Sequence, residues 1–488
     1  MSQIRKLGKH TLIYATGIVI GKAASFIMLP IYTRFLTPAD YGVLELLQMT
    51  IDVIGMLAGL GLASSVFKFY AEEDAPEGRA EVISTSTTAL AILSVVSAAI
   101  GAAFAPQLTR LVLGPGQPTI YFQLFFLIYF IQTITTIPYL FIRAEHRSVM
   151  FVVLNVVRLI LSLSFNILFV VYFRMGIRGV LYSTIIAWTL TGGYLTLYTY
   201  RRVGRRFSLP RIEAMTLFAL PLVLWSLANF VLTFSDRYFL KYFTDNATVG
   251  IYSLAYQFGF ALAAFALVPF NSIWDPQRFE VARQPDADQI FRRVFFYLNL
   301  VLLTCACVIS ISVHDILRVM AGYSFRSAYK LVPVLMVPFI LQAWSNYCNI
   351  GLYLKNKTRP LAWAAVITVI VDLGLNYLLI PRYGPYGAAW ATAGAYAVRL
   401  ALVYPLSQRY VHINYGWGRV LAVTALLTAV YFARNLLPSF RMFPSLAISA
   451  GFLAAAGLVI HYGILHADER ALVKEFAMKP LALLNLAA

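Results

Sequence analysis

Five charged residues stand inside long apolar stretches of the sequence, which makes them the first candidates for a functional role. They are Lys22, Asp52, Arg158, Asp372 and Arg399. If these stretches cross a bilayer, a charge turned toward lipid costs about 2.5–3.5 kcal/mol, so the side chains should face one another or a water-filled cavity. Two interpretations stay open: structural ion pairing, for example between Lys22 and Asp52, and a site that uses the charges.

A polar stripe includes Asp52. Glu45, Gln48 and Asp52 are spaced i, i+3 and i+7, which places them on one face of a helix, and Gly55 and Gly59 continue near the same face. In a membrane helix such a stripe lines water or packs against another helix, and the spacing alone does not separate the two roles.

The adjacent residues Asp236 and Arg237 lie near the outer end of another apolar stretch, at the place that Arg34 occupies in the first stretch. Long basic side chains at the end of a span can extend to the membrane interface, and this is the interpretation for Arg34. For the pair Asp236 and Arg237, a gate contact and an interfacial anchor are both open.

Motifs of soluble catalysis are missing from the sequence. It contains no GxxxxGK[ST] loop for nucleotide phosphates and no pair of histidines with metal-ligand spacing. Cys305, Cys307 and Cys348 lie in apolar stretches, where buried small side chains are the expected role. The net charge of +18 comes from basic residues in short segments between apolar stretches. We therefore predict no enzyme, no metal site and no nucleic-acid partner.

The elements that must position these residues are membrane-spanning helices. Of the 488 residues, 60% are apolar and 12% are charged, which is far from the composition of a soluble domain. About 20 mostly apolar residues suffice to cross the hydrocarbon core. The sequence predicts an all-α integral membrane protein with about 14 spans, at 10–36, 41–70, 83–105, 120–142, 149–173, 179–200, 214–240, 249–273, 291–314, 329–354, 360–380, 387–408, 419–436 and 444–466.

The loops between these spans are short and unequally charged. With the N-terminus in the cytoplasm, the predicted inner segments and their flanks hold roughly twice as many Lys and Arg as the outer ones, as the positive-inside rule requires. We expect both termini to be cytoplasmic. None of the loops is long enough to fold as a separate catalytic domain.

The sequence contains an internal repeat. Asn166 followed by Gly176 in one half matches Asn376 followed by Gly384 in the other, and the connectors RAEHR (143–147) and KNKTR (355–359) correspond at an offset of 212. We predict an N-lobe at 1–205, a C-lobe at 206–412 and an appendix at 413–488. Two six-helix units in the same orientation imply a pseudo-two-fold axis along the membrane normal, with a cavity between the lobes.

The embedded charges differ between the two copies of this repeat. The predicted register aligns Lys22 with Trp225, Asp52 with Phe260 and Arg158 with Thr368, and it aligns Asp372 with Ser162 and Arg399 with Thr191. Charges that served only the fold should occur in both copies. A site between the lobes is therefore the favoured interpretation.

Three segments resemble one known family. They are GKAASFIMLPIYTRFLTPADYGVLELLQ (21–48), SDRYFLKYFTDNATVGIYSLAYQ (235–257) and LNYLLIPRYGPYGAAWAT (375–392). In these segments the chain resembles Wzx-type polysaccharide flippases of the multidrug/oligosaccharidyl-lipid/polysaccharide (MOP) exporter superfamily. The resemblance extends over essentially the whole chain, and a fold of about 14 helices is similar to the Wzx and MurJ branches rather than the MATE branch.

The resemblance implies a function and roles for the charged residues. It implies a flippase of the bacterial cytoplasmic membrane that moves an undecaprenyl-pyrophosphate-linked oligosaccharide to the outer leaflet by alternating access. Lys22, Arg158 and Arg399 would then bind the anionic pyrophosphate. Membrane lipids, a polysaccharide polymerase and glycosyltransferases are the partners that it implies.

The resemblance also implies ion coupling and leaves a rival. It implies no cofactor other than a coupling ion, H⁺ or Na⁺. Glu45, Asp52 and Asp372 are the candidate carriers, and Asp236 and Arg237 are the candidate gate. The rival is a MATE-like cation-coupled exporter of small molecules, which would need an acidic cavity with few cations.

Overall fold

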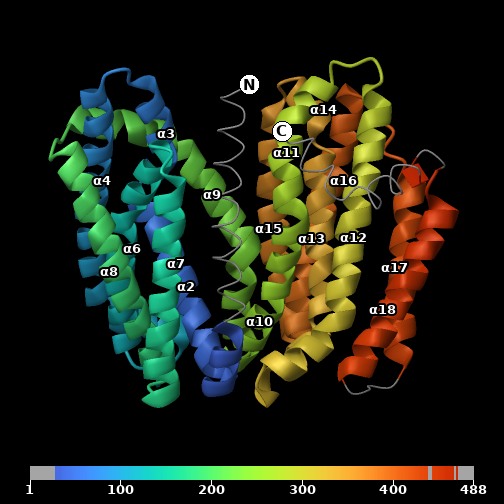
Figure 1. Cartoon of the computed structure of the whole chain (residues 1–488), viewed down its shortest axis with the longest axis horizontal. Coiled ribbons are helices and arrows are strands. Elements are labelled where there is room, and N and C mark those ends of the chain that lie inside the picture. Colours follow the sequence, from blue (N-terminus) through green and yellow to red (C-terminus); the bar gives the residue numbers. More distant parts are fainter. Residues whose placement is uncertain (1–27, 438–441, 467–468, 471–488) are drawn as a thin grey trace. The chain divides into compact units, whose positions relative to one another are not determined.

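The structure is a computed structural model that describes residues 28–437, 442–466 and 469–470. The chain forms two compact units. The first takes the chain up to Lys241 together with Asp245–Gly250, and the second takes Tyr242–Thr244 and the chain from Ile251 onward. The described residues are helical or in turns, with no strand. The predicted all-α class is confirmed (Figure 1).

Within the described residues, 11 helices are long and apolar enough to cross a membrane, or 12 if a bent pair is counted as one span. Two predicted spans that are missing from this count account for the difference from the predicted 14. The segment 10–36 lies mostly outside the described residues. Helix α16 (Pro385–Tyr410) forms as predicted, but it is not among the helices whose length and hydropathy mark them as spans.

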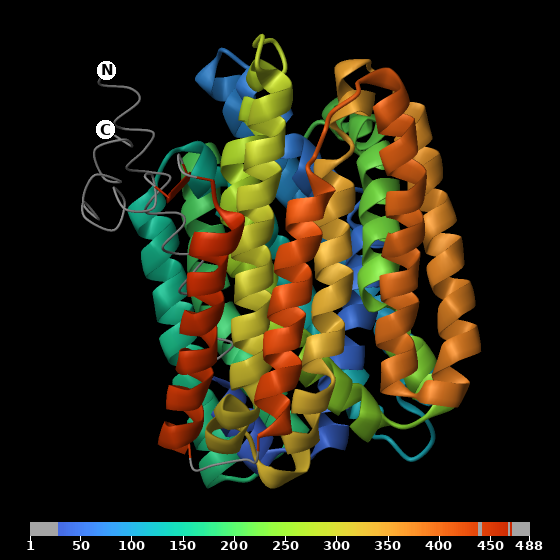
Figure 2. The same cartoon turned by 90° about the vertical axis from the view of Figure 1, so that its right-hand side faces the viewer.

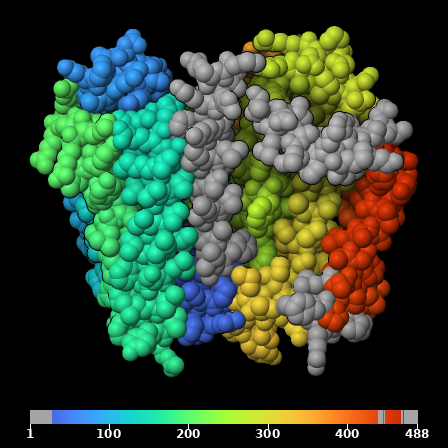
Figure 3. Space-filling model, in the orientation of Figure 1, coloured from blue at the N-terminus to red at the C-terminus, as the bar shows by residue number. Residues whose placement is uncertain are grey.

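The first unit packs its long helices around an apolar core that includes Leu62, Ile83, Ile137 and Phe141. Its main helices are α2 (Pro38–Ala58), α3 (Leu62–Glu72), α4 (Pro76–Ala103), α6 (Ile120–Ala144), α7 (Ser148–Asn166), α8 (Ile177–Val203) and α9 (Leu209–Phe243). Helix α7 is the least buried of its spans, with 11% of its apolar window inside the protein, and its surface is visible along one face in Figure 3.

Helix α2 has a well-defined start. Thr37 and Asp40 form a capping box, in which the Asp40 amide donates to Thr37 Oγ1 at 3.2 Å and the Thr37 amide donates to Asp40 Oδ2 at 3.0 Å. Pro38 stands at the first helical position, where its missing amide hydrogen removes no hydrogen bond.

The predicted single span 41–70 is wrong, because the helix is broken between α2 and α3. Leu60 and Gly61 have φ angles of 48° and 68°, which interrupt the helical hydrogen-bond ladder. A Cβ atom on Gly61 would lie 2.6 Å from Val223 Cγ2 of α9, so the break also brings α9 close. Only glycine combines this backbone conformation with so close an approach.

The start of α10 (Asn246–Leu262) lies against the start of α2. A Cβ atom on Gly42 would stand 2.0 Å from the carbonyl oxygen of Asn246, and one on Gly250 would stand 2.0 Å from that of Pro38. Gly42 and Gly250 are the matching glycines of the two sequence repeats. Their backbones are therefore in direct contact, with no room for a side chain on either.

The second unit contains the remaining long helices. They are α11 (Val268–Val281), α12 (Ala287–Met320), α13 (Val332–Tyr347), α14 (Ile350–Leu354), α15 (Thr358–Tyr383), α16, α17 (Trp417–Leu436) and α18 (Met442–Val459). Helices α15 and α16 form a close pair at one edge of this unit, and α17 and α18, the predicted appendix, pack on α12 (Figure 2). The predicted span 329–354 corresponds to Val332–Leu354 (α13 and α14), and the chain bends by 47° where η4 (Tyr323–Lys330) meets α13.

The internal repeat is visible in the backbone of each unit taken separately. His146 and Asn356 have φ angles of 55° and 54° just before α7 and α15, and Gly176 and Gly384 have φ angles of 57° and 53° just before α8 and α16. The turns therefore correspond at offsets of 210 (His146 to Asn356) and 208 (Gly176 to Gly384). The connector offset of 212 predicted from the sequence letters is wrong by two residues.

Candidate functional site

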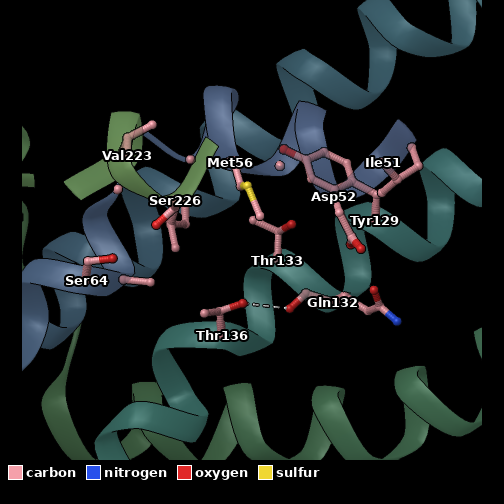
Figure 4. A pocket seen from close by; sticks show the side chains of 15 residues that line it. Ile51, Asp52, Met56, Ser64, Tyr129, Gln132, Thr133, Thr136, Val223 and Ser226 are labelled. Carbon is pink, nitrogen blue, oxygen red and sulfur yellow. Dashed lines mark hydrogen bonds between the residues drawn. The ribbon is translucent and has the colours of Figure 1, made fainter. Parts of the chain in front are cut away.

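A cavity of about 360 Å³ lies inside the first unit, among α2, α3, α6 and α9. Figure 4 shows the side chains around it. Its walls are formed by Ile51, Asp52, Gly55, Met56, Gly59, Gly61, Ala63, Ser64, Leu90, Tyr129, Gln132, Thr133, Thr136, Val223 and Ser226. Most of the polar groups are hydroxyls and amides, and Asp52 is the one charged side chain in this set.

Helix α2 contributes Asp52 and the space beside it. Gln48 Nε2 donates to Asp52 Oδ1 at 2.8 Å, which holds the half-buried carboxylate in place at the cavity wall. One turn further on, a Cβ atom on Gly55 would lie 3.3 Å from the Tyr129 ring. The glycine therefore lets the aromatic ring reach the cavity beside the carboxylate.

Helix α6 contributes a polar face. Tyr129, Gln132, Thr133 and Thr136 are spaced so that they share one side of the helix. Thr136 Oγ1 donates to the Gln132 carbonyl at 3.1 Å, and the Tyr129 hydroxyl lies 3.0 Å from Ser97 Oγ. With its ring and hydroxyl donors and acceptors, this wall can bind a polyhydroxylated ligand, while Asp52 can accept hydrogen bonds or hold a cation.

Asp236 and Arg237 form a second cluster in the first unit, and both are buried, with 2% and 1% of their surface exposed. Arg237 Nη1 donates to Asp236 Oδ1 at 2.9 Å and to the Thr233 carbonyl at 2.8 Å. Glu45 of α2 interacts electrostatically with Arg237 and accepts a hydrogen bond from Tyr41. The stripe on α2 is thus divided, with Glu45 beside this ion pair and Asp52 at the cavity.

Arg158 of α7 is not among the residues that line the cavity. Its guanidinium carbon is 4.1 Å from the Trp188 ring centre and 5.4 Å from that of Tyr139, and Nη2 donates to Asn155 Oδ1 at 2.5 Å. No carboxylate pairs with Arg158 within the described chain. Aromatic faces and an amide stabilise its positive charge. Unlike a carboxylate, these partners do not neutralise the charge, so it can still bind an anion.

Asp372 and Arg399 belong to one cluster in the second unit. Asn376 Nδ2 donates to the fully buried Asp372 at 3.1 Å. Tyr396 interacts electrostatically with both Asp372 and Arg399, and Gln342 Nε2 donates to its hydroxyl at 2.9 Å. Lys22 lies outside the described residues, and so does its predicted pairing with Asp52.

Several polar groups of these sites escaped the sequence analysis. Gln132 and Gln342 lie at the same offset of 210 as Asn166 and Asn376, so the repeat itself carried the signal for them. A buried network in the second unit was also missed. Arg434 donates to Ser445, which donates in turn to Asp315, and this network joins α17, α18 and α12.

No group of three or more His, Cys, Asp or Glu side chains that could hold a metal ion occurs in the part of the chain that the structure describes. Cys305, Cys307 and Cys348 are free thiols, the last two buried. The cavity itself presents hydroxyls, an amide, an aromatic ring and one carboxylate.

Comparison with known proteins gives a family and a fold. The family described as "Polysaccharide biosynthesis protein" matches residues 7–276, which is more than half of the chain. No curated protein matches the chain in sequence. A structure of the lipid II flippase MurJ in an inward closed conformation has a TM-score of 0.72 at 10% identity, covering 92% of this chain and 99% of that one.

Two multidrug transporters share the fold at lower similarity. An inward-facing MATE family transporter of the MOP superfamily has a TM-score of 0.62 at 15% identity, covering 82% of this chain and 95% of its own. The MATE multidrug transporter DinF-BH has a TM-score of 0.55 at 16% identity, covering 83% and 95%. The predicted MOP-type fold is confirmed, and the proteins that share it are transporters.

Proposed function

The chain belongs to the polysaccharide biosynthesis protein family, and from that membership we propose that it flips an undecaprenyl-pyrophosphate-linked oligosaccharide across the bacterial cytoplasmic membrane. The direction of net transport is from the inner to the outer leaflet, and both chain termini are cytoplasmic. The observation that carries the proposal is the family match together with a fold shared with a lipid II flippase.

The cavity in the first unit supports a sugar ligand. Its volume of about 360 Å³ and its hydroxyl and amide groups suit part of an oligosaccharide head. Tyr129 offers a ring face for a pyranose, and Gln132, Thr133 and Ser226 offer donors and acceptors for its hydroxyls. Asp52 accepts hydrogen bonds from sugar hydroxyls more strongly than a neutral group would.

The pyrophosphate needs cations because a bare anion is costly inside a bilayer. Arg158 is suited to this role, since no carboxylate in the described chain neutralises it and its aromatic neighbours leave its charge available. Lys22 and Arg399 are the other proposed partners. The polymerase and glycosyltransferases that would act after and before this step are proposed partners as well.

Coupling to an ion gradient completes the proposal. Asp52 and Asp372 each lie beside an amide donor, and Glu45 lies beside the buried pair Asp236 and Arg237. Protonation or Na⁺ binding at these carboxylates would change the charge of each cluster during alternating access. The pair Asp236 and Arg237 would act as a gate contact that forms and breaks in this cycle.

Reconstitution in liposomes tests the proposed function. The protein is incorporated with a fluorescent undecaprenyl-pyrophosphate-linked oligosaccharide, and an external lectin or glycosidase reports how much sugar has changed leaflet. Wild-type protein should accelerate exposure well above protein-free vesicles, and Asp52→Asn should slow it. Equal rates with and without the protein would refute the proposal.

One observation favours the MATE-like alternative. Asp52 is the one charge among the described residues that line the cavity, and an acidic cavity suits a cationic drug. The discriminating measurement is export of a cationic dye such as ethidium from cells that lack other pumps. Dye export that Asp52→Asn abolishes, without sugar flipping in liposomes, would decide for the exporter.

A further inference from the structure

A groove on the second unit combines apolar walls with one basic residue, Arg359, which follows two lysines in the chain. It lies between α15 and α16, has a volume of about 320 Å³, and is lined by Arg359, Pro360, Trp363, Ala364, Ile367, Leu402 and Leu406. Trp363 at its edge is 68% exposed. The connector that leads into α15 also contains Lys355 and Lys357, which are exposed and stand four and two residues before Arg359 in the sequence.

These three cations have no counter-ion in the part of the chain that the structure describes. No ion pair or side-chain hydrogen bond involves Lys355, Lys357 or Arg359 within the described residues. The segment therefore concentrates three positive charges where an apolar, membrane-facing groove begins. A ligand that matches both features has an anionic head and a hydrocarbon chain.

The equivalent connector of the first unit serves as an internal comparison. By the offset of 210, Lys355 corresponds to Glu145 and Lys357 to Arg147. In the first unit Glu145 pairs with Arg147 at 2.7 Å and with Arg202 at 3.4 Å. The charge at the position of Lys355 is therefore opposite in the two copies. In the described chain, Arg147 of the first connector pairs with a carboxylate, and the basic residues of the second connector do not.

The residues that line the groove can be compared with their counterparts in the first unit. The offsets relate Pro360 to Met150 and Ala364 to Leu154 on the first helix of each pair, and Leu406 to Tyr198 on the second. In the first unit these larger side chains pack together in one apolar cluster. The second unit has the smaller residue at these three positions, where Ala364 and Leu406 belong to an apolar cluster of their own. At Trp363 and Ile367 it has the larger residue, since their counterparts are Val153 and Val157. The two units therefore differ in the charge of the connector and in the shape of the apolar surface that follows it.

We propose that this groove binds an anionic phospholipid, with the phosphate between Lys355, Lys357 and Arg359 and one acyl chain between α15 and α16. Basic pockets between membrane helices on the cytoplasmic side are suited to anionic head groups. The apolar walls and Trp363 would hold the chain at the depth of the bilayer. This site is separate from the sugar cavity and does not depend on the proposed transport function.

Native mass spectrometry of the purified full chain tests the proposal. Dioleoyl phosphatidylglycerol is titrated against dioleoyl phosphatidylcholine, and the affinities of the first bound lipid are compared. We expect about a tenfold preference for phosphatidylglycerol, since each nearby basic residue contributes several-fold. The triple variant Lys355→Gln, Lys357→Gln, Arg359→Gln should bind both lipids about equally.

Two further variants separate charge from volume. Leu406→Tyr introduces the residue found at the matching position of the first unit. It should lower the affinity for both lipids several-fold while keeping part of the preference for phosphatidylglycerol. Arg147→Gln, the matched control in the connector of the first unit, should leave the preference for phosphatidylglycerol at the wild-type value. Millimolar glycerol phosphate should not displace the lipid, because it lacks the chain.

Three outcomes would overturn the proposal. One is an unchanged preference in the triple variant, and another is an equal loss in Arg147→Gln. The third is stoichiometric displacement of phosphatidylglycerol by undecaprenyl phosphate, which would assign the groove to the lipid of the transported substrate instead.

Discussion

At the scale of single residues, the embedded charges are accommodated in two different ways. Arg237 is fully buried with a carboxylate in contact, whereas Arg158 lies on two aromatic rings with an amide as its hydrogen-bond partner. A paired cation is structurally secure but electrostatically neutralised. A buried cation without a carboxylate is costly to the fold, and this difference supports the proposal that Arg158 contacts an anionic ligand, whereas Arg237 in this state is held by Asp236.

Substitution of Arg158 should abolish transport without removing the protein from the membrane. Arg158→Gln eliminates the positive charge, and Arg158→Lys keeps it but loses the planar stacking on Trp188. In the liposome assay we expect a drop of at least tenfold for the first variant and an intermediate rate for the second. Arg174→Gln, at an exposed position, is the matched control, and a wild-type rate in Arg158→Gln would contradict the assignment.

Loss of one partner of the buried pair should destabilise the protein. Asp236→Asn leaves Arg237 without its carboxylate, and breaking a buried pair costs about 3–5 kcal/mol. We expect a clearly lower melting temperature in detergent, measured by a thermal unfolding assay. The double variant Asp236→Asn, Arg237→Gln should recover part of the loss. An unchanged melting temperature in the single variant would show that the pair is not needed for the fold.

At the scale of helices, glycine decides where side chains from neighbouring helices can meet. Gly55 admits the Tyr129 ring at the cavity, and Gly61 admits α9 at the break between α2 and α3. The cavity exists because α2 ends where it does and because α6 turns its polar face toward that end. Its shape is thus a property of helix packing more than of any one lining residue.

Filling the cavity from α2 should block it. Gly55→Leu places a branched side chain against Tyr129, where even a Cβ atom would be 3.3 Å from the ring. We expect transport in liposomes to fall severalfold or more while the amount of protein in the membrane is retained. Gly193→Leu on α8 is the control, because nothing lies within 4 Å of a Cβ atom there. Equal activity of the two variants would place the substrate elsewhere.

The sequence predicted the helices well and the site only in part. Hydropathy and length located the spans, because a bilayer imposes the same requirement on every one of them. The break at Leu60 and Gly61 was not predicted, since the left-handed conformation depends on contact with α9. Gln132 and Thr133 were missed for a related reason. Uncharged polar residues cost little in a helix, so their role emerges only from the neighbours that surround them.

At the scale of the whole molecule, the chain divides into two units, and the first includes nearly all of α9, which the sequence places in the C-lobe. The units repeat the same turns before α7 and α15 and before α8 and α16. They differ in their hollows, a cavity with a polar wall in the first unit and an apolar groove with Arg359 in the second.

Orientation in the membrane can be tested directly. We predict that a cysteine introduced at Asn356 or at Arg205 is protected in intact cells from a membrane-impermeant maleimide, because basic connectors stay in the cytoplasm. A cysteine at Pro115, in a loop predicted to be external, should be labelled. All three positions are exposed on the protein surface. The reverse pattern of labelling would invert the proposed topology.

The direct contact between Gly42 and Gly250 has an evolutionary consequence. Each copy of the duplicated segment supplies one of the two glycines. A Cβ atom on either glycine would lie 2.0 Å from a backbone carbonyl oxygen of the other copy. We expect that neither glycine can be substituted alone. A side chain in one copy would clash with the main chain of the other, and no side-chain change there could relieve the clash. Among relatives of this chain, both positions should therefore remain glycine together or change only along with the paths of α2 and α10.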